Sequence, residues 1–204
     1  MACCNNRRKP EWLKIKLPMG QLSTGVLNIV RGHNLHTICT SGMCPNQGEC
    51  WGAGTATFMI GGDVCTRSCK FCNVATGRPA PLDPREPENI ANSVKLLELK
   101  HAVITSVDRD DLEDLGAGHW VRVIEAVKRE NPNTTMEVLI PDFQGRRELV
   151  QQVIDVRPEV ISHNLETVRR LPDSVRSRAK YDISLEVIRQ VSESGIVSKS
   201  GIML

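Results

Sequence analysis

Residues 55–72 read TATFMIGGDVCTRSCKFC, an apolar run followed at once by two glycines and three cysteines. The run TATFMI is rich in β-branched and aromatic residues and is too short for a helix. It therefore predicts a strand that leads directly into a cysteine loop. The sequence that follows this stretch decides what kind of sheet the strand joins.

Helix-length and strand-length apolar segments alternate after residue 60. Ile90, Val94 and Leu97 recur at helical spacing after a proline-rich connection that cannot be helical throughout. Further strands are predicted at 101–107, 134–140, 159–164 and 196–204. The later helices are marked by Trp120, Ile124 and Val127, then by Leu149 and Val153, then by Leu185, Ile188 and Val191. Five strands separated by helical crossovers imply a parallel sheet wound with right-handed connections.

Such a sheet is either open and doubly wound or closed toward a barrel. No glycine-rich dinucleotide fingerprint follows the first strand, which disfavours the Rossmann arrangement. We therefore expect the fold class α/β, with a partial (β/α) barrel of the TIM type over residues 55–204. The sequence stops in an apolar strand with no covering layer, so we also expect C-terminal sequence to be missing.

Residues 1–54 form a separate N-terminal extension in this prediction. The segment GQLSTGVLNIVR at 20–31 carries apolar residues on one helical face and predicts a short helix. The segment 33–54 is rich in Gly, Asn, Ser and Cys and has no apolar period. It predicts a loop that is held by something other than apolar packing.

Composition limits the classes of partner and compartment. The formal net charge is only +2, which gives no argument from charge for a nucleic-acid or membrane partner. No signal peptide and no apolar run of roughly 18 residues occurs, so we expect a soluble, cytoplasmic protein. In that reducing compartment the eight cysteines are poor candidates for disulfides, and their grouping indicates metal or redox chemistry instead.

Six of the cysteines form two triplets, and we expect all six to be metal ligands. The triplets are Cys39, Cys44 and Cys50, and Cys65, Cys69 and Cys72. The second triplet follows the carboxyl end of the first strand, which is where barrels carry their chemistry. Three thiolates can hold a four-iron cluster and leave one iron without a protein ligand. That open iron can bind a substrate.

Zinc is the alternative for these triplets, as one or two sites completed by His33, His36 or His101. Zinc sites usually contain paired C-x2-C units, and only Cys69 and Cys72 have that spacing. The spacing therefore favours an iron–sulfur cluster over zinc.

The second triplet resembles a known signature. The pattern C-x3-C-x2-C after a first strand is similar to that of the radical S-adenosylmethionine superfamily, and Cys65, Cys69 and Cys72 match it position by position. The resemblance implies that these three cysteines are the catalytic ligands of a [4Fe–4S] cluster. In that superfamily the open iron chelates S-adenosylmethionine, and the reduced cluster cleaves its sulfonium to give a 5′-deoxyadenosyl radical.

A longer resemblance covers the chain from residue 11 to the end. The first triplet, followed in order by NVATGRP, VITSVDRDDL, PDFQG, SHNLETV and KSGIML, is similar to the lipoyl synthase family. This resemblance implies that Cys39, Cys44 and Cys50 hold an auxiliary [4Fe–4S] cluster, which is consumed as the sulfur source. Two sulfur atoms are then inserted at C6 and C8 of a protein-bound octanoyl-lysine.

The same resemblance implies the partners. They are octanoylated lipoyl domains of 2-oxoacid dehydrogenase E2 subunits and the glycine-cleavage H protein, a low-potential electron donor and an iron–sulfur carrier. The sequence departs from the family in lacking a C-terminal RSSY motif, whose serine is the fourth ligand of the auxiliary cluster. Two other readings therefore remain open. One is a radical enzyme whose second cluster only relays electrons, and the other is a non-catalytic metal-binding fragment.

Polar side chains also follow two of the later strands. They are Thr105, Ser106, Asp108 and Arg109 after one strand, and His163, Asn164 and Glu166 after another. Because the carboxyl ends of barrel strands carry chemistry, we expect contacts to S-adenosylmethionine or to the octanoyl-lysine, with Ser106 and Asn164 as cofactor-binding residues. The alternative is that these side chains cap the helices that follow.

Overall fold

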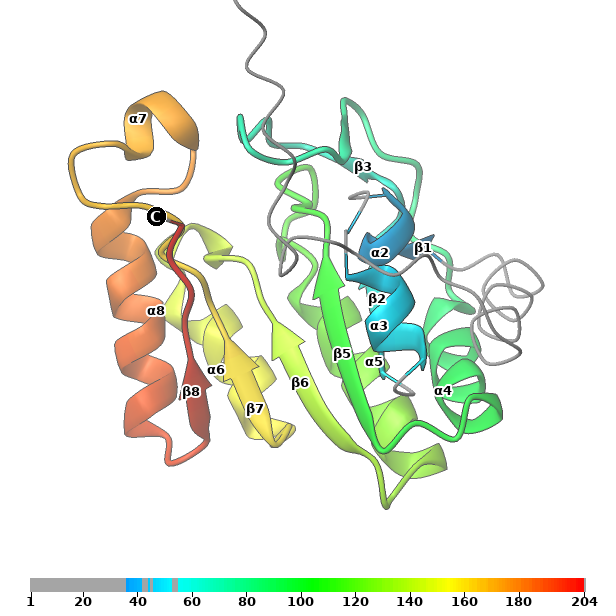
Figure 1. Cartoon of the computed structure of the whole chain (residues 1–204). Coiled ribbons are helices and arrows are strands. Elements are labelled where there is room, and N and C mark those ends of the chain that lie inside the picture. Colours follow the sequence, from blue (N-terminus) through cyan, green and yellow to red (C-terminus); the bar gives the residue numbers. More distant parts are fainter. Residues whose placement is uncertain (1–35, 42–43, 45, 53–54, 204) are drawn as a thin grey trace, which may run out of the picture.

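The computed structural model of the chain describes residues 36–41, 44, 46–52 and 55–203. Five strands of the main sheet run parallel and are neighbours in the order in which they follow along the chain (Figure 1). These strands are β2 (Thr55–Ile60), β5 (His101–Ser106), β6 (Thr135–Leu139), β7 (Val160–Ser162) and β8 (Val197–Lys199). The five strands therefore lie where the apolar runs predict them, although the last two are shorter than expected.

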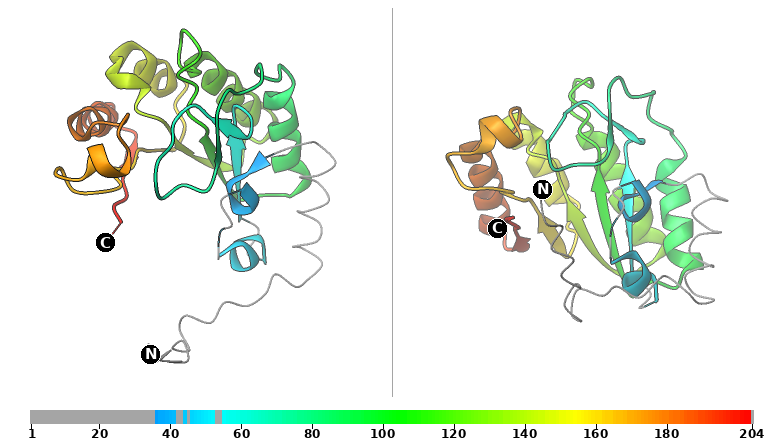
Figure 2. Two further views of the ribbon diagram at one scale, coloured as in Figure 1. Left: turned by 90° about the horizontal axis from the view of Figure 1, so that it is seen from above. Right: turned by 45° about the horizontal axis from the view of Figure 1, so that its top comes forward.

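Helices make the connections between the parallel strands. They are α4 (Glu86–Leu96), α5 (Ala117–Glu130), α6 (Arg147–Asp155) and α8 (Tyr181–Glu193). Seen from above, they follow the outer side of a curved sheet (Figure 2). The predicted partial barrel of parallel strands and crossover helices is thus confirmed. Two short elements, η2 (Phe143–Gly145) and α7 (Pro172–Val175), precede α6 and α8.

The main core lies between the sheet and these helices. On β2, Phe58 is fully buried, and on β5 the same is true of Ile104. From the helices, Ile90 of α4 and Trp120 of α5 meet them in one continuous apolar cluster. Helix α4 begins where the proline-rich connection ends, because Pro87 is tolerated in a first turn, where no backbone donor is needed.

The region before β2 differs from its prediction. The strand β1 (His36–Thr37) pairs antiparallel with β2, and two short helices, α2 (Ile38–Ser41) and α3 (Gln47–Gly52), contact β2 (Figure 1). The expectation of a loop held without apolar packing is therefore wrong for the described part of 33–54. Cys39 is buried in the main core, and one-turn helices are too short to show an apolar period. The helix expected at 20–31 lies outside the described residues.

The loop that carries the second triplet is bounded by two more short strands. These are β3 (Val64–Cys65) and β4 (Ala75–Thr76), which pair in parallel. Beside them, Met59, Val74 and Val107 form a second buried apolar cluster. None of the helices in the described part of the chain combines the length and apolar character that a membrane crossing requires.

Candidate functional site

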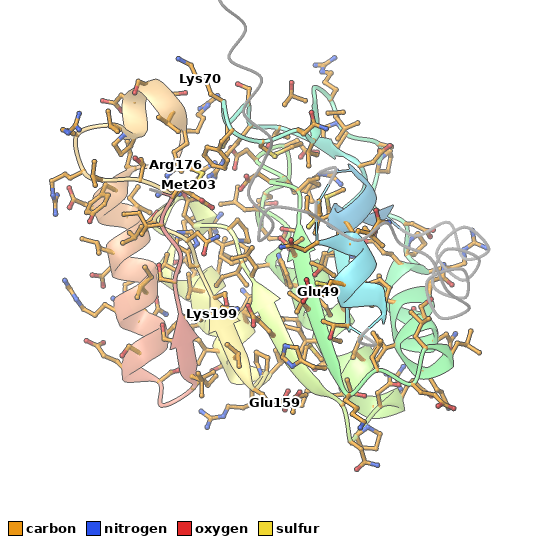
Figure 3. The ribbon with its side chains drawn as sticks, in the orientation of Figure 1. Glu49, Lys70, Glu159, Arg176, Lys199 and Met203 are labelled. Carbon is orange, nitrogen blue, oxygen red and sulfur yellow. The ribbon has the colours of Figure 1, made fainter. Side chains whose placement is uncertain are left out.

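A cavity of about 340 Å³ opens at the carboxyl ends of β2, β5, β6 and β7. Cys65, Cys69 and Cys72 line it together with Ser106 and Asn164, the two residues predicted to bind the cofactor. The structure thus brings the second triplet and both polar strand ends to one cavity. Figure 3 shows Lys70 and Arg176 at this end of the molecule, with Glu159 at the opposite end.

Backbone hydrogen bonds shape the cysteine loop around the cavity. The N–H of Cys72 donates to the carbonyl of Cys69 at 3.0 Å, and Lys70 N–H donates to the carbonyl of Val175 at 2.9 Å. The sulfur of Cys65 accepts from the N–H groups of Arg67, at 3.4 Å, and Asp108, at 3.3 Å. Two amide donors therefore orient the first sulfur of the triplet and stabilise its negative charge.

Burial governs the protonation of these thiols in the metal-free protein. It raises the pKa of Cys69 to about 11, with further increases from Asp108 and from the neighbouring thiols of Cys65 and Cys72. Burial also raises the pKa of Cys65. Three closely placed thiols in this setting become thiolates when a cationic group binds them, because metal binding displaces the protons.

Among the described residues, no group of three His, Cys, Asp or Glu side chains is close enough to hold a single metal ion. A four-iron cluster makes a different demand, since each thiolate binds a separate iron. The triplet on the cavity wall could therefore hold a cluster, whereas its geometry does not suit one zinc ion. His101 does not help, because it lies at the start of β5, with Nδ1 2.8 Å from Thr135 Oγ1, and not at the cysteine end of that strand.

Arg67 ties the cysteine loop to the connection that follows β5. Its Nε and Nη2 each lie 2.8 Å from the carboxylate of Asp110, and its Nη1 lies 3.4 Å from Asp108. The same Nη2 lies 2.9 Å from Asp142. Burial acts to lower the pKa of Arg67, but these three carboxylates outweigh it and raise the pKa. The guanidinium is therefore charged and holds the loop against two strand ends.

A hydroxyl reinforces this attachment. Thr66 Oγ1 donates to the carbonyl of Asp108 at 2.9 Å and accepts from the N–H of Asp110 at 3.0 Å. Burial raises the pKa of the Asp108 carboxyl to about 6, against the lowering effect of Arg67. The connection after β5 thus provides both backbone and side-chain partners for the cysteine loop.

Two buried polar groups of the cavity lack partners among the described residues. They are Arg176 Nε and Asp142 Oδ2, and both residues line the cavity. The other nitrogens of Arg176 donate to the Asn164 carbonyl at 3.1 Å and to Ser184 Oγ at 2.7 Å. Buried groups left unpaired cost about 1–3 kcal/mol each, so such pairs are typical of places where a ligand supplies the partner.

Both ring nitrogens of His163, one of the candidate residues, form hydrogen bonds within the protein. Its Nδ1 lies 2.9 Å from the carbonyl of Ile140 and its Nε2 lies 3.0 Å from Ser184 Oγ. Since a carbonyl only accepts, Nδ1 carries the hydrogen and Nε2 accepts from the serine. Burial lowers the pKa of His163, in agreement with this neutral form.

The first triplet lies beside β2. The N–H of Cys44 donates to the Cys39 carbonyl at 3.1 Å, and the N–H of Cys50 donates to the Asn46 carbonyl at 3.0 Å. Burial raises the pKa of Cys50, and the thiols of Cys39 and Cys44 raise it further. Cys39 belongs to the main apolar core, and Cys44 and Cys50 pack against that core. Ile38, which precedes the triplet, lines the large cavity and packs against the second apolar cluster.

The remaining candidates separate into two groups. Thr105, Asp108 and Glu166 line the cavity, whereas Arg109 is buried behind it and binds Gly61 and Asp111. Helix capping does not explain the polar residues after β5, because α5 has Gly116 as its N-cap.

Arg67, Asp142 and Arg176 were not singled out from the sequence. The position of Arg67 between two cysteines and the PDFQG segment around Asp142 were the only available signals.

Comparisons with known proteins identify the family. The sequence model of the Radical SAM superfamily matches residues 59–204. The chain is 67% identical to a lipoyl synthase of Treponema denticola over 204 residues, which cover 100% of this chain and 70% of that protein. It is 65% identical to a lipoyl synthase of Parabacteroides distasonis over 197 residues, which cover 97% of this chain and 70% of that protein.

A solved structure supports the fold alone. Methylornithine synthase superposes with a TM-score of 0.56 at 15% sequence identity, over 72% of this chain and 44% of that one. The family follows from the sequence comparisons, which span the fold, the cavity and both cysteine triplets. On this basis the chain belongs to the lipoyl synthase family of the radical S-adenosylmethionine superfamily.

Proposed function

We propose that this protein inserts two sulfur atoms at C6 and C8 of an octanoyl group carried on a lysine of a lipoyl domain or of the glycine-cleavage H protein. The observation that carries the proposal is the cavity wall formed by Cys65, Cys69 and Cys72 in a member of this family. The reaction needs a cluster with an open iron, a site for S-adenosylmethionine and a source of sulfur.

The second triplet supports the first requirement. Three converging thiols on one loop can occupy three irons of a [4Fe–4S] cluster and leave the fourth iron facing the cavity. When bound, this cluster and S-adenosylmethionine supply the reducing electron and the radical that removes hydrogen from unactivated carbon. The amide donors on the Cys65 sulfur are the protein feature that would tune such a cluster.

Unpaired polar groups in the cavity support the second requirement. Arg176 Nε is a cationic donor without a partner in the described chain, and it suits the carboxylate of S-adenosylmethionine. Asp142 Oδ2 is an unpaired acceptor that suits an ammonium or hydroxyl group. Ser106 and Asn164, at two strand ends in the same cavity, add polar groups for the rest of the molecule.

The cavity also has an apolar part that suits an alkyl chain. Met59, Val74, Leu139 and Ile140 all contribute to its lining. Their side chains would exclude water from the carbon atoms to be functionalised. A long acyl chain on a flexible lysine arm can therefore enter this cavity while its carrier domain stays outside.

The first triplet supports the third requirement. Cys39, Cys44 and Cys50 would hold an auxiliary [4Fe–4S] cluster whose sulfur is donated, because sulfide bound only to iron is available to a carbon radical. Reduction requires a low-potential electron donor, and repeated turnover requires an iron–sulfur carrier to rebuild the consumed cluster.

Anaerobic reconstitution of three variants tests this assignment. We expect about eight irons per chain in the wild type and about four after alanine replaces all cysteines of either triplet. Loss of the second triplet should abolish release of methionine and 5′-deoxyadenosine. Loss of the first should keep that release but abolish sulfur insertion into an octanoyl-lysine peptide, measured by mass spectrometry.

The matched control is the double variant Cys3→Ala, Cys4→Ala, which removes two thiols outside the triplets and should behave as the wild type. Sulfur insertion that survives loss of the first triplet would reassign this triplet to electron relay. Zinc in place of iron in the wild type would overturn the radical mechanism.

A further inference from the structure

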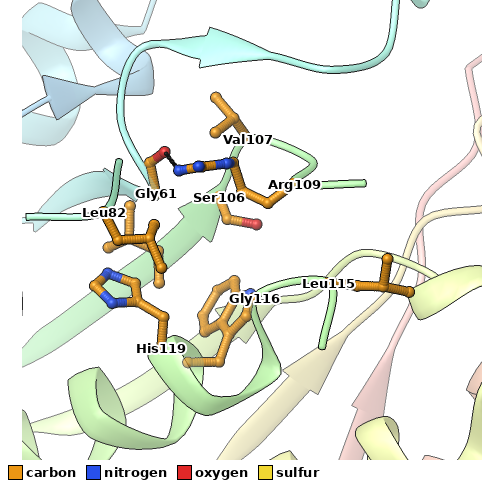
Figure 4. Close-up of a pocket in the computed structure, with 10 residues that line it drawn as sticks. Gly61, Leu82, Ser106, Val107, Arg109, Leu115, Gly116 and His119 are labelled. Carbon is orange, nitrogen blue, oxygen red and sulfur yellow. Dashed lines mark hydrogen bonds between the residues drawn. The ribbon is translucent and has the colours of Figure 1, made fainter. Parts of the chain in front are cut away.

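Two buried charged side chains, Glu86 and Arg109, hold Gly61, the residue that follows β2. Figure 4 shows the contact from Arg109. The N–H of Gly61 donates to Glu86 Oε2 at 2.9 Å, and its carbonyl accepts from Arg109 Nη1 at 2.9 Å. Glu86 is 8% exposed and Arg109 is 4% exposed. Neither side chain lines the large cavity beside the cysteines. Burying a charged side chain costs free energy. Both of these buried charges form a hydrogen bond with the backbone of the same glycine.

Glu86 is itself oriented by a histidine. His119 of α5 contacts Glu86 Oε2 through Nε2, and its Nδ1 lies 3.3 Å from Arg122 Nη2. Because a guanidinium only donates, Nδ1 must accept, and Nε2 therefore carries the hydrogen that is donated to Glu86. The same carboxylate oxygen thus accepts from the histidine and from Gly61.

Arg109 is oriented in a similar way. Its Nε and Nη2 each lie 2.9 Å from the carboxylate of Asp111, which leaves Nη1 to reach Gly61. A bidentate pair of this kind fixes the plane of the guanidinium. The side chains of Glu86 and Arg109 are therefore both oriented by contacts other than their hydrogen bonds to Gly61.

Without these contacts, the backbone at Gly61 and Gly62 could adopt several conformations. Gly61 has φ +83° and Gly62 has φ +100°, both in the left-handed region that only glycine visits readily. A β-carbon on Gly61 would also come within 3.4 Å of Val107 and 3.5 Å of the Arg109 side chain. Two consecutive glycines have many alternative conformations, so the turn needs outside partners to keep one.

This turn sets where the cysteine loop begins. The chain passes from β2 through Gly61 and Gly62 to Cys65, beyond which Arg67 binds the carboxylates of Asp108 and Asp110. Each of these two segments, the cysteine loop and the connection after β5, therefore contributes an arginine that binds the other segment. Arg109 holds the backbone on one side of Cys65, and Arg67 is held on the other.

We propose that Glu86, Arg109 and His119 are positioning residues that fix the Gly61–Gly62 turn and thereby the position from which Cys65 enters the cavity. The role of Cys65 rests on the proposed function, whereas the hold on the turn is a property of the protein alone. The three residues act through Gly61 and touch no reacting group.

A matched control lies at the other end of the same helix pair. Asn131 is 7% exposed, and its Nδ2 donates to the carbonyl of Ala91 in α4 at 3.0 Å and to that of Val127 in α5 at 3.2 Å. Like the contact between Glu86 and His119, it joins α4 to α5. Asn131→Ala removes a buried polar link of the same kind without touching Gly61.

Amide hydrogen exchange on the metal-free protein tests the hold on the turn. In Glu86→Ala and Arg109→Met we expect the amides of residues 60–66 to exchange about tenfold faster than in the wild type, as for loss of one hydrogen bond. Asn131→Ala should leave these rates unchanged. Glu86→Gln keeps an acceptor for the Gly61 N–H and should restore slow exchange in part. If Glu86→Ala does not fold, Arg109→Met alone tests the hold on the turn.

The reconstituted protein provides the second readout. We expect Glu86→Ala to need about tenfold more S-adenosylmethionine than the wild type for the half-maximal change in the electron paramagnetic resonance spectrum of the reduced cluster. Asn131→Ala should need the same concentration as the wild type. Unchanged exchange at 60–66, or equal acceleration in Asn131→Ala, overturns the proposal. If the variants exchange faster but the wild type assembles no iron–sulfur cluster, the role of the three residues in fixing the turn stands. The proposed function is then overturned.

Discussion

The two cysteine triplets are of equal size but are held in different ways. Around the second triplet, side chains from distant parts of the chain fix the loop, above all Arg67 with Asp108, Asp110 and Asp142. Around the first, the described residues form no side-chain ion pairs of that kind, and the described contacts are local turns, the pairing of β1 with β2 and the packing of Cys39 in the main core.

The proposed function offers a reason for this difference. A site that must present an open iron to a cofactor needs fixed geometry, and distant partners on rigid strand ends provide it. A site whose cluster is taken apart and rebuilt in each cycle gains from a local framework that can be refilled without disturbing the barrel. We therefore expect substitutions at distant residues to affect the second triplet and to spare the first.

The largest effect should come from Arg67→Met. This change leaves the carboxylate of Asp142 buried and without its cationic partner, which costs about 3 kcal/mol of the free energy of unfolding. Urea denaturation measures the loss, and the iron content should fall from about eight toward about four. Arg85→Met is the control, because Arg85 forms an exposed ion pair with Asp83 and its loss should stay within about 0.5 kcal/mol. Equal loss of iron from both triplets would remove the distinction between them.

An intermediate effect should come from Thr66→Val. The change keeps the shape of the side chain but removes the hydroxyl that bonds both the Asp108 carbonyl and the Asp110 N–H. We expect a loss of about 1–2 kcal/mol in urea denaturation, with faster amide exchange confined to the second triplet and its anchor. The same substitution at the exposed Thr76 provides the comparison and should be nearly neutral. Faster exchange around the first triplet would contradict the expectation.

The smallest effect should come from Lys199→Met, at an ion pair that touches neither triplet. Lys199 lies 2.8 Å from Glu137, with Ser162 Oγ also donating to that carboxylate. Burial raises the pKa of Glu137, but the hydrogen bonds from Lys199 and Ser162 outweigh it and lower the pKa, with His101 as a weaker neighbour. Because the Lys199 side chain is 60% exposed, its removal should cost less than about 1 kcal/mol at pH 7.

The pH dependence of that loss has a definite sign. A carboxyl with a lowered pKa in the folded state stabilises the protein above its unfolded value of about 4.3, and the contribution disappears as the pH falls through the folded value. The difference between the wild type and Lys199→Met should therefore shrink as the pH falls below about 4, in urea denaturations across this range. A difference that grows on acidification, or iron loss at either triplet, would show that the pair does more than join β6 to β8.

Local sequence was sufficient to predict the barrel and the cysteine loop that lines the cavity. The run HAVITSV is short, apolar and β-branched, and such runs form buried parallel strands wherever helices separate them. Cys65, Cys69 and Cys72 were identified from spacing because ligands on one loop must be close in sequence. Ser106 reaches the same cavity because the carboxyl ends of parallel strands share one edge.

The partners of these elements could not be predicted in the same way. Arg67 and Asp142 are 75 positions apart, and Gly61 and Glu86 are 25 positions apart, so no local pattern relates them. Their pairing depends on how the strand ends approach one another in the folded sheet. The helices around Cys39 were missed for the opposite reason, because a single turn is too short to show a period.

The cysteines of the second triplet precede in the sequence the aspartates that anchor their loop, and this order matters during synthesis of the chain. The six cysteines of the two triplets are all translated before Asp108, Asp110 and Asp142. At about 5–20 residues per second, the thiols wait on the order of ten seconds for the carboxylates that organise their loop. During that interval they are open to oxidation and to premature metal capture. Timely synthesis of the strands that follow therefore protects the nascent site as well as building it.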